Sequence, residues 1–206
     1  MGKFVILSDC RCGGTTLTET LDQHPQLNVH GEVLLSMRLG QRPRSDWPDW
    51  PALVAQAFDH CDGFHLQRYQ LPWHRDPWNA FAAYPDLRVI DLRRLDLLQQ
   101  YASWRVAMAT QQWRERPESL PRLTWNEDDF RKTASAWEEG RAYTDRAFAG
   151  LPQLKLTFQD LCDDFGGTIY RCQRFLGIEP TPLKPSQPRN PKLDYADVFF
   201  GWPAPA

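Results

Sequence analysis

Short apolar runs alternate with helical patterns along most of the chain and predict buried strands joined by helices. The clearest run, residues 4–7, reads FVIL, and a second, residues 87–92, reads LRVIDL. Near-continuous apolar residues, rather than strict alternation, are typical of a strand that is buried on both faces. The expected strands are residues 4–7, 27–30, 63–66, 87–92 and 154–158.

The segments between these strands carry helical periodicity. Asp96 is a good N-cap, and Leu97, Tyr101, Trp104 and Met108 follow it on one helical stripe. Alternating strands and helices of this length predict an α/β fold, with a mostly parallel central sheet flanked by helices and right-handed crossovers. The first expected helix begins at Thr15. The others cover residues 53–58, 79–83, 96–113, 133–149 and 167–177.

The stretch after the first strand has the character of an anion-binding loop. Residues 8–16 read SDCRCGGTT, so two glycines let the backbone approach a ligand before a helix opens at Thr15. A Walker A loop would carry a lysine here, where Gly14 stands, so Arg11 is the candidate cation. A Gly-Gly turn alone is equally compatible with a purely structural turn, and it is the arginine that favours anion binding.

A second basic segment follows the strand at residues 87–92. Arg93 and Arg94 come at the carboxyl end of that strand, the same sheet edge as Arg11, and Ser103 lies nine residues after Arg94. A guanidinium and a hydroxyl so placed can bind one phosphate group. Taken alone, the pair would be read as solvent-exposed arginines at a strand end.

These segments together resemble the nucleotide-binding motifs of sulfotransferases. Residues 11–17 (RCGGTTL), with 21–25 (LDQHP) and Gly31-Glu32, resemble the 5′-phosphosulfate loop, nearest to the tyrosylprotein and bacterial carbohydrate branches. Residues 93–103 resemble the 3′-phosphate signature of that family, and residues 157–161 resemble its Tyr-Glu-Asp-Leu segment. The resemblance implies a P-loop-containing nucleoside triphosphate hydrolase-like fold.

It also implies an activity, the transfer of a sulfuryl group from 3′-phosphoadenosine-5′-phosphosulfate (PAPS) to a hydroxyl of a sugar or small-molecule acceptor. The transfer is an in-line displacement that requires no metal. The residues that would bind the donor are Arg11, Cys12, Gly13, Gly14, Thr15, Thr16 and Leu17 at the 5′ end, and Arg94, Ser103 and Arg189 elsewhere, with Arg93 as the alternate for Arg94.

Three residues are candidates for proton transfer and leaving-group stabilisation. Glu32 matches the Gly-Glu whose carboxylate is the general base in the tyrosylprotein branch, and His30 is the competing base. His65 stands where related bacterial enzymes often carry a lysine, so a protonated His65 would stabilise the leaving phosphate. A buried histidine that only packs is the alternative for His65.

Composition limits the other partners. A net charge of −2 over 206 residues gives no reason to expect a nucleic-acid partner, so any basic site is local. No apolar run is long enough for a signal peptide or a membrane span, so we expect a cytoplasmic protein. The five scattered cysteines indicate reduced thiols, and no zinc spacing indicates a metal site.

The length suits one domain, residues 1–206, with a core of its own. Two other functions stay open from the sequence: a P-loop kinase or other nucleotide-dependent phosphotransferase, and a catalytically inactive nucleotide-binding module. The kinase is disfavoured because the loop lacks a lysine and no clear Mg²⁺-binding carboxylate is present. The Trp/Pro-rich residues 38–51 are expected to form a loop, either a wall of the acceptor site or a plain surface loop.

Overall fold

The computed structural model of the protein describes residues 2–36, 49–71, 75–114, 117, 119–186 and 193–202. Most of the expected loop at residues 38–51, and Arg189, therefore lie outside the described residues.

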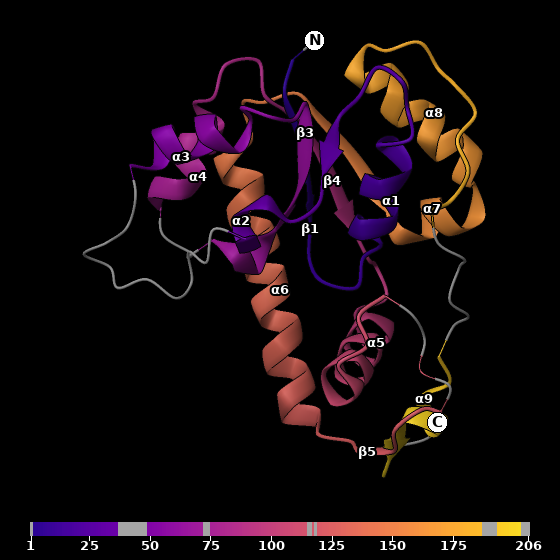
Figure 1. The fold of residues 1–206 in the computed structure, drawn as a ribbon. Helices are drawn as coiled ribbons and strands as arrows, with labels where there is room; N and C mark the ends of the chain where they lie inside the picture. The colour runs from indigo at the N-terminus through magenta and orange to yellow at the C-terminus, as the bar shows by residue number, and fades with distance from the viewer. Residues whose placement is uncertain are drawn as a thin grey trace.

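A five-stranded sheet forms the centre, in the order β2-β3-β1-β4-β6 (Figure 1). Every neighbouring pair is parallel, so the carboxyl ends of the strands meet at one edge. At that edge Ser8 of β1 is aligned with Gln67 of β3 and Leu92 of β4. The strands are β1 (Phe4–Ser8), β2 (Val29–His30), β3 (Gly63–Gln67), β4 (Arg88–Arg93) and β6 (Gln153–Thr157).

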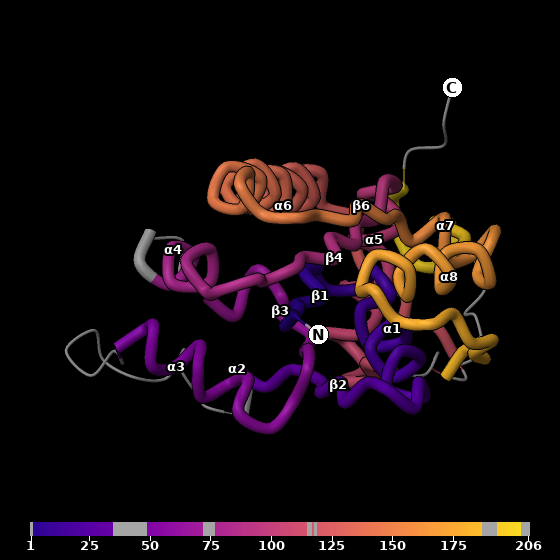
Figure 2. The backbone as a smooth tube through the Cα atoms, turned by 90° about the horizontal axis from the view of Figure 1, so that it is seen from above, coloured from indigo at the N-terminus to yellow at the C-terminus, as the bar shows by residue number. Residues whose placement is uncertain are grey.

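Helices cover both faces of this sheet, which confirms the expected α/β architecture (Figure 2). One face packs against α2, α3, α4 and α6, and the other against α1, α7 and α8. The helices are α1 (Gly14–Leu21), α2 (Val33–Ser36), α3 (Trp50–Ala57), α4 (Arg75–Ala82), α5 (Leu97–Thr110), α6 (Glu127–Ala147), α7 (Phe158–Asp163), α8 (Phe165–Leu176) and α9 (Tyr195–Val198), with a 3₁₀ turn, η3 (Arg68–Gln70).

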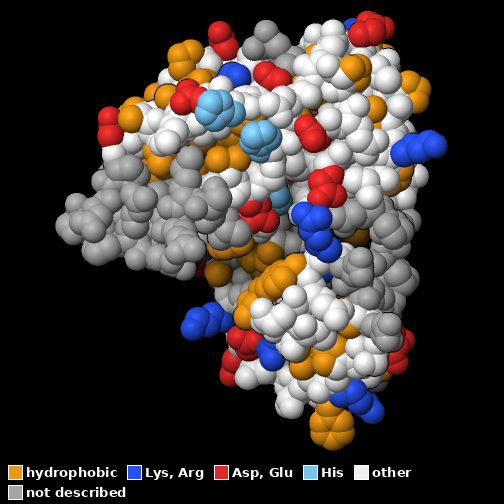
Figure 3. Space-filling model, in the orientation of Figure 1, with side chains coloured by type: hydrophobic (Ala, Val, Ile, Leu, Met, Phe, Trp, Pro, Cys, Tyr) orange, Lys and Arg blue, Asp and Glu red, His pale blue; other side chains and the backbone are white. Residues whose placement is uncertain are grey.

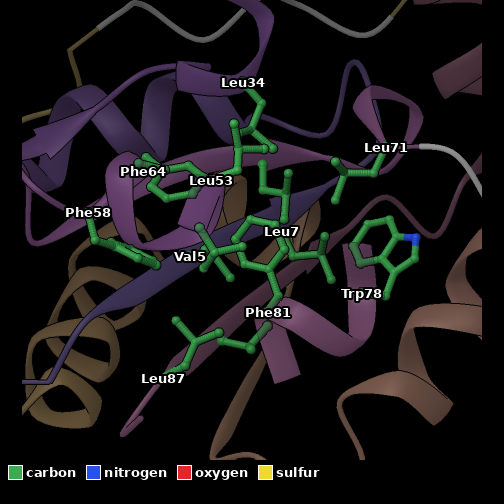
Figure 4. Packing of buried hydrophobic residues seen from close by; sticks show 14 of the residues in the cluster. Val5, Leu7, Leu34, Leu53, Phe58, Phe64, Leu71, Trp78, Phe81 and Leu87 are labelled. Atoms are coloured by element: carbon green, nitrogen blue, oxygen red, sulfur yellow. The ribbon is translucent and has the colours of Figure 1, made fainter. Parts of the chain in front are cut away.

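Strand β1 divides the core in two because its successive side chains point to opposite faces. Val5 and Leu7 pack with Phe64 and Phe81 on one face (Figure 4). Phe4 and Ile6 pack on the other face with α1 and α8. These four side chains of β1 are all buried, as expected for a central strand.

A third hydrophobic cluster is built around α5 and the C-terminal segment, in the lower part of Figure 1. Two short strands, β5 (Leu123–Thr124) and β7 (Phe199–Phe200), pair in parallel there. The Tyr101 ring of α5 stacks on Phe199 and lies edge-on to Trp125. The sequence did not predict these strands because two-residue segments carry no periodicity.

Several helix boundaries differ from expectation for local reasons. Helix α6 begins at Glu127 rather than residue 133, because the Asn126 side chain accepts a hydrogen bond from the Asp129 N–H. Phe158, expected in the last strand, begins α7, because Thr157 and Asp160 form a reciprocal capping box. Helix α5 ends at Thr110, three residues early, where Gln111 adopts the left-handed conformation.

Candidate functional site

The loop between β1 and α1 is shaped by backbone conformations that favour glycine. Gly13 has φ 86°, and a Cβ at Gly14 would lie 2.2 Å from Nε2 of His65. No described side chain caps the first turn of α1, so the N–H groups there remain available to a ligand. An uncapped helix N-terminus preceded by glycines is suited to a phosphate or sulfate group.

The loop forms one wall of a cavity of about 360 Å³ at the carboxyl edge of the sheet. Helix α5, the segment after it and helices α7 and α8 form the other walls. Most candidate donor-binding residues are brought together here, with His65 from β3. The cavity is lined by Arg11, Gly13, Gly14, Thr15, Thr16, His65, Arg94 and Ser103, among others.

Arg11 connects the loop to α5. Its Nε donates a hydrogen bond to the Ser103 hydroxyl at 2.9 Å, and one terminal nitrogen donates to the Trp113 carbonyl. Since Ser103 accepts from Arg11, the Ser103 hydroxyl hydrogen remains available to a ligand. Arg11 itself has φ 61°, an uncommon conformation for a residue with a side chain.

Arg94 lies beside Arg11 and is 9% exposed. Its Nη1 donates to the Arg11 carbonyl at 3.3 Å, and its guanidinium carbon lies 4.3 Å from the centre of the Phe158 ring. Its Nε is buried and has no hydrogen-bond partner among the described residues. A buried donor without a partner is costly, so this nitrogen indicates that Arg94 is arranged for a bound acceptor.

The surroundings of Arg11 and Arg94 disfavour the charged form of both guanidiniums. Burial lowers the pKa of both Arg11 and Arg94, and the like charge of Arg94 lowers the pKa of Arg11 further. An anion in the cavity would relieve both effects. On the face shown in Figure 3, basic and acidic side chains are interspersed.

Arg93 is engaged elsewhere. It pairs with Asp91 at 2.5 Å and with Asp145 at 2.6 Å. Burial works to lower its pKa, but the hydrogen bonds that Arg93 donates to these two carboxylates outweigh burial and raise it. Of the two adjacent arginines, the structure therefore places Arg94, not Arg93, in the cavity with Ser103.

Two predicted loop residues are placed in the core instead. Cys12 and Leu17 are fully buried in the cluster beneath α1 and are not among the described residues that line the cavity. The Leu17 N–H already donates to the Gly13 carbonyl at 3.0 Å. Burial raises the pKa of Cys12 to about 12, so it is a neutral thiol. Their side chains therefore pack beneath the loop, and contact of these two residues with the donor stays a prediction.

Glu32 is held by two side-chain amides. Its Oε1 accepts from Nε2 of Gln67 and its Oε2 from Nε2 of Gln70, each at 2.5 Å. Glu32 is not among the described lining residues, but it is hydrogen-bonded to Gln67, which does line the cavity. His30 is exposed at the edge strand β2 and is not among the described lining residues.

His65 is almost fully buried under the loop, with Nε2 2.8 Å from the Ser8 hydroxyl. Its Nδ1 is 3.9 Å from Oε1 of Glu32. Burial lowers the pKa of His65 to about 4, so the imidazole is neutral near pH 7. This corrects the expectation of a protonated His65, although the side chain does reach the cavity.

A buried ionic network behind the loop was missed from the sequence. Arg141 of α6 pairs with Asp9 at 2.6 Å and donates to the Arg94 carbonyl at 3.3 Å. It also donates to the Gln100 side chain at 2.9 Å, and Gln100 donates to the Cys10 carbonyl. Arg141 thus ties the loop to Arg94, from a position mid-helix with no local signal in the sequence.

The C-terminal segment is also tied to the cavity. The Gln99 side chain donates to the Leu193 carbonyl at 2.6 Å and accepts from the Leu193 N–H at 3.2 Å. Both residues line the cavity. Of residues 187–192 nothing is described, so the predicted contact of Arg189 with the donor stays a prediction.

The described residues contain neither a candidate membrane span nor a candidate metal site. No helix there is long and apolar enough to cross a membrane. No group of three or more His, Cys, Asp or Glu side chains in the described ranges is arranged to hold a metal ion.

Comparison with solved structures identifies the fold of this chain. No protein-family model matches the sequence, and neither does any curated protein. Solved structures do match, among them a sulfotransferase from Alicyclobacillus acidocaldarius, which has a TM-score of 0.61 at 15% identity, covering 93% of this chain and 87% of its own. The sulfotransferase domains of the curacin biosynthetic pathway and of the Synechococcus PCC 7002 olefin synthase follow, with TM-scores of 0.59 and 0.52, both at 14% identity. Each covers 88% of this chain, and the matches extend over 75% and 74% of those domains. The chain therefore has the sulfotransferase fold, a P-loop-like α/β fold, as the sequence resemblance implied.

Proposed function

We propose that this protein is a PAPS-dependent sulfotransferase that acts on a hydroxyl of a sugar or small molecule, with residues 1–206 as one domain. One observation carries the proposal: two guanidiniums, that of the half-buried Arg11 and that of the buried Arg94, share a cavity with an uncapped helix N-terminus. Arg94 also has a buried Nε without a partner among the described residues. Such a cavity favours a ligand with more than one anionic group.

PAPS carries such groups at its 5′ and 3′ ends. In this proposal, Arg11, the hydroxyls of Thr15 and Thr16, and the N–H groups from Gly13 to Thr16 bind the 5′-phosphosulfate. Arg94 and Ser103 bind the 3′-phosphate, using the free Nε and the free hydroxyl hydrogen described above. The donor supplies an activated sulfuryl group, and the chain supplies orientation and charge.

We assign the general base to Glu32. The acceptor oxygen forms a bond to sulfur while the bond from sulfur to the 5′-phosphate breaks, and the hydroxyl proton passes to the Glu32 carboxylate. Two amides orient this carboxylate beside the cavity wall, whereas Asp9 and Asp91 are paired with guanidiniums. Because guanidiniums occupy the oxygens of both aspartates, we assign the acceptor proton to Glu32 rather than to Asp9 or Asp91.

The kinase alternative finds less support at this site. A phosphotransferase of that kind needs a carboxylate free to hold Mg²⁺ near the loop. Asp9, the carboxylate that lines the cavity, is engaged by Arg141 at 2.6 Å and by Arg68 at 3.5 Å.

A binding and turnover experiment tests the proposal. We expect adenosine 3′,5′-bisphosphate to raise the melting temperature without Mg²⁺, since a ligand that binds only the native state stabilises it. Incubation with ³⁵S-labelled PAPS and a panel of sugars and small alcohols should then yield a labelled product.

The other outcomes are informative. Stabilisation by Mg-ATP and not by the bisphosphate would overturn the proposal in favour of a kinase. Bisphosphate binding without transfer to any acceptor or to water would indicate an inactive nucleotide-binding module.

A further inference from the structure

A short turn at the end of β3 surrounds the Glu32 carboxylate. Residues 67–70 read QRYQ and form the 3₁₀ turn η3 with Gln67 as its N-cap. Both glutamines of the turn direct their side-chain nitrogens at Glu32, one to each carboxylate oxygen, at 2.5 Å. Gln67 is 35 positions from Glu32 and Gln70 is 38 away, so the contact is made by the fold.

The orientation of one amide is fixed by the turn itself. The Oε1 atom of Gln70 accepts the backbone N–H of Gln67 at 3.2 Å. With its oxygen so engaged, the Gln70 amide presents its nitrogen to Oε2 of Glu32. The turn therefore holds its own glutamine in the rotamer that binds Glu32.

Both donors are neutral, which matters for a proton acceptor. The Tyr69 hydroxyl of the same turn also hydrogen-bonds Glu32. Each carboxylate oxygen can accept about two hydrogen bonds, so the two amides and this hydroxyl still leave room for an acceptor hydroxyl. His65 is the nearest described group that could become a cation, 3.9 Å away. The arrangement orients Glu32 without a formal positive charge from either glutamine.

We propose that Gln67 and Gln70 are positioning residues for Glu32: they hold both carboxylate oxygens by neutral hydrogen bonds and leave them able to take the acceptor proton. The inference rests on the proposed function, because it takes Glu32 as the general base.

The test uses water as the acceptor, so it needs no identified alcohol. Water attacks the sulfur of PAPS, the bond to the 5′-phosphate breaks and the proton passes to Glu32, giving sulfate and adenosine 3′,5′-bisphosphate. We expect Gln70→Leu to slow bisphosphate formation about tenfold or more, as misplacement of a reacting group does, with little change in bisphosphate affinity.

A double-mutant cycle separates positioning from general damage. In a Glu32→Gln background, Gln70→Leu should slow the reaction by less than about twofold, because the group it positions is gone. Equal losses in both backgrounds would show that Gln70 acts independently of Glu32 and would overturn the proposal. So would full activity of Gln70→Leu.

Two further variants guard against misfolding. Gln70→Asn keeps the polarity but shortens the reach, and should behave like Gln70→Leu. Gln153→Leu removes a comparable amide bond, 2.6 Å to the Phe148 carbonyl, away from the cavity, and should leave the rate unchanged. In crystal structures, the Glu32 carboxylate should be displaced in Gln70→Leu and not in Gln153→Leu.

Different results would overturn the positioning role of the two glutamines and the proposed sulfotransferase function. A wild-type chain that binds no bisphosphate and forms none from PAPS would overturn the sulfotransferase function and this inference with it. An active wild type with unaffected Gln70 variants would overturn only the inference.

Discussion

The Nε of Arg11 donates a hydrogen bond to the Oγ of Ser103 at 2.9 Å, across 92 positions of the sequence. This bond joins the loop after β1 to the middle of α5, two segments that the sequence resemblance assigns to opposite ends of the nucleotide. Because Arg94 also contacts the Arg11 backbone, the candidate donor-binding residues form one connected cluster. Substitutions within it should couple rather than act independently.

Loss of either Arg11 or Arg94 should weaken nucleotide binding. We expect Arg11→Ala and Arg94→Ala each to reduce the affinity for adenosine 3′,5′-bisphosphate by about 2–4 kcal/mol, since each removes a charge-assisted hydrogen bond from a desolvated phosphate. Isothermal titration calorimetry measures this. ATP lacks the 3′-phosphate, so its affinity should fall less in Arg94→Ala.

Arg93→Ala is the matched control, one residue away. Arg93 pairs with Asp91 and Asp145 outside the cavity, so its loss should lower the melting temperature with little effect on bisphosphate affinity. If Arg93→Ala weakened binding as much as Arg94→Ala, the assignment of Arg94 to the 3′-phosphate would be untenable.

Glu32 and His30 should differ sharply in their effect on turnover. We expect Glu32→Gln to slow sulfuryl transfer by about two to four orders of magnitude, the usual range for a lost general base, while bisphosphate binding is retained. His30→Gln should have little effect because the side chain is exposed at an edge strand. Initial rates with labelled PAPS compare the two, and the opposite ranking would move the base to His30.

The sequence was sufficient for the elements whose signals are local. Continuous apolar residues placed the five strands of the main sheet, and Asp96 marked the start of α5. The loop residues, Arg94 and Ser103 came together as the shared sheet edge predicts.

The missed features depend on contacts between distant segments. Cys12 of the loop and Leu17 of α1 stand within the stretch that resembles a ligand-binding motif, yet their side chains are buried in the core. Arg141 reaches Asp9 across 132 positions, and the Gln70 contact with Glu32 follows from the end of β3. No periodicity or short motif encodes such pairs, because they are set by the packing of whole elements.

Gly14 is expected to tolerate no side chain. A Cβ there would lie 2.2 Å from Nε2 of His65 and 2.8 Å from the Ser8 hydroxyl, both buried. Gly14→Ala should therefore destabilise the protein by roughly 1–3 kcal/mol, the usual cost of overpacking, as measured by urea denaturation.

The same clash predicts a rescue. In a His65→Ala background the imidazole is gone, so Gly14→Ala should cost clearly less than in the wild type. An unchanged cost would mean that the loop backbone, and not His65, excludes the methyl group.

Burial of neutral His65 should make stability depend on pH in a defined window. Its pKa falls from 6.5 to about 4 on folding, because burial disfavours the imidazolium. Between these two values the unfolded chain binds a proton that the native protein does not, so the free energy of unfolding decreases as the pH is lowered from about 6.5 to 4. The full effect of this shift amounts to about 3 kcal/mol. Above pH 6.5 the contribution is constant.

His65→Gln removes this titration and keeps a polar side chain near Ser8, so its stability should fall less between pH 7 and pH 4.5 than that of the wild type. Urea denaturation at several pH values measures both, and the difference between the two proteins cancels most contributions from carboxylates and other histidines. Parallel pH profiles would show that His65 is not buried as the neutral form. Because burial keeps the imidazole of His65 neutral near pH 7, we expect no alkaline loss of activity from its deprotonation, and we propose that Arg11 and the N-terminus of α1 stabilise the leaving phosphate.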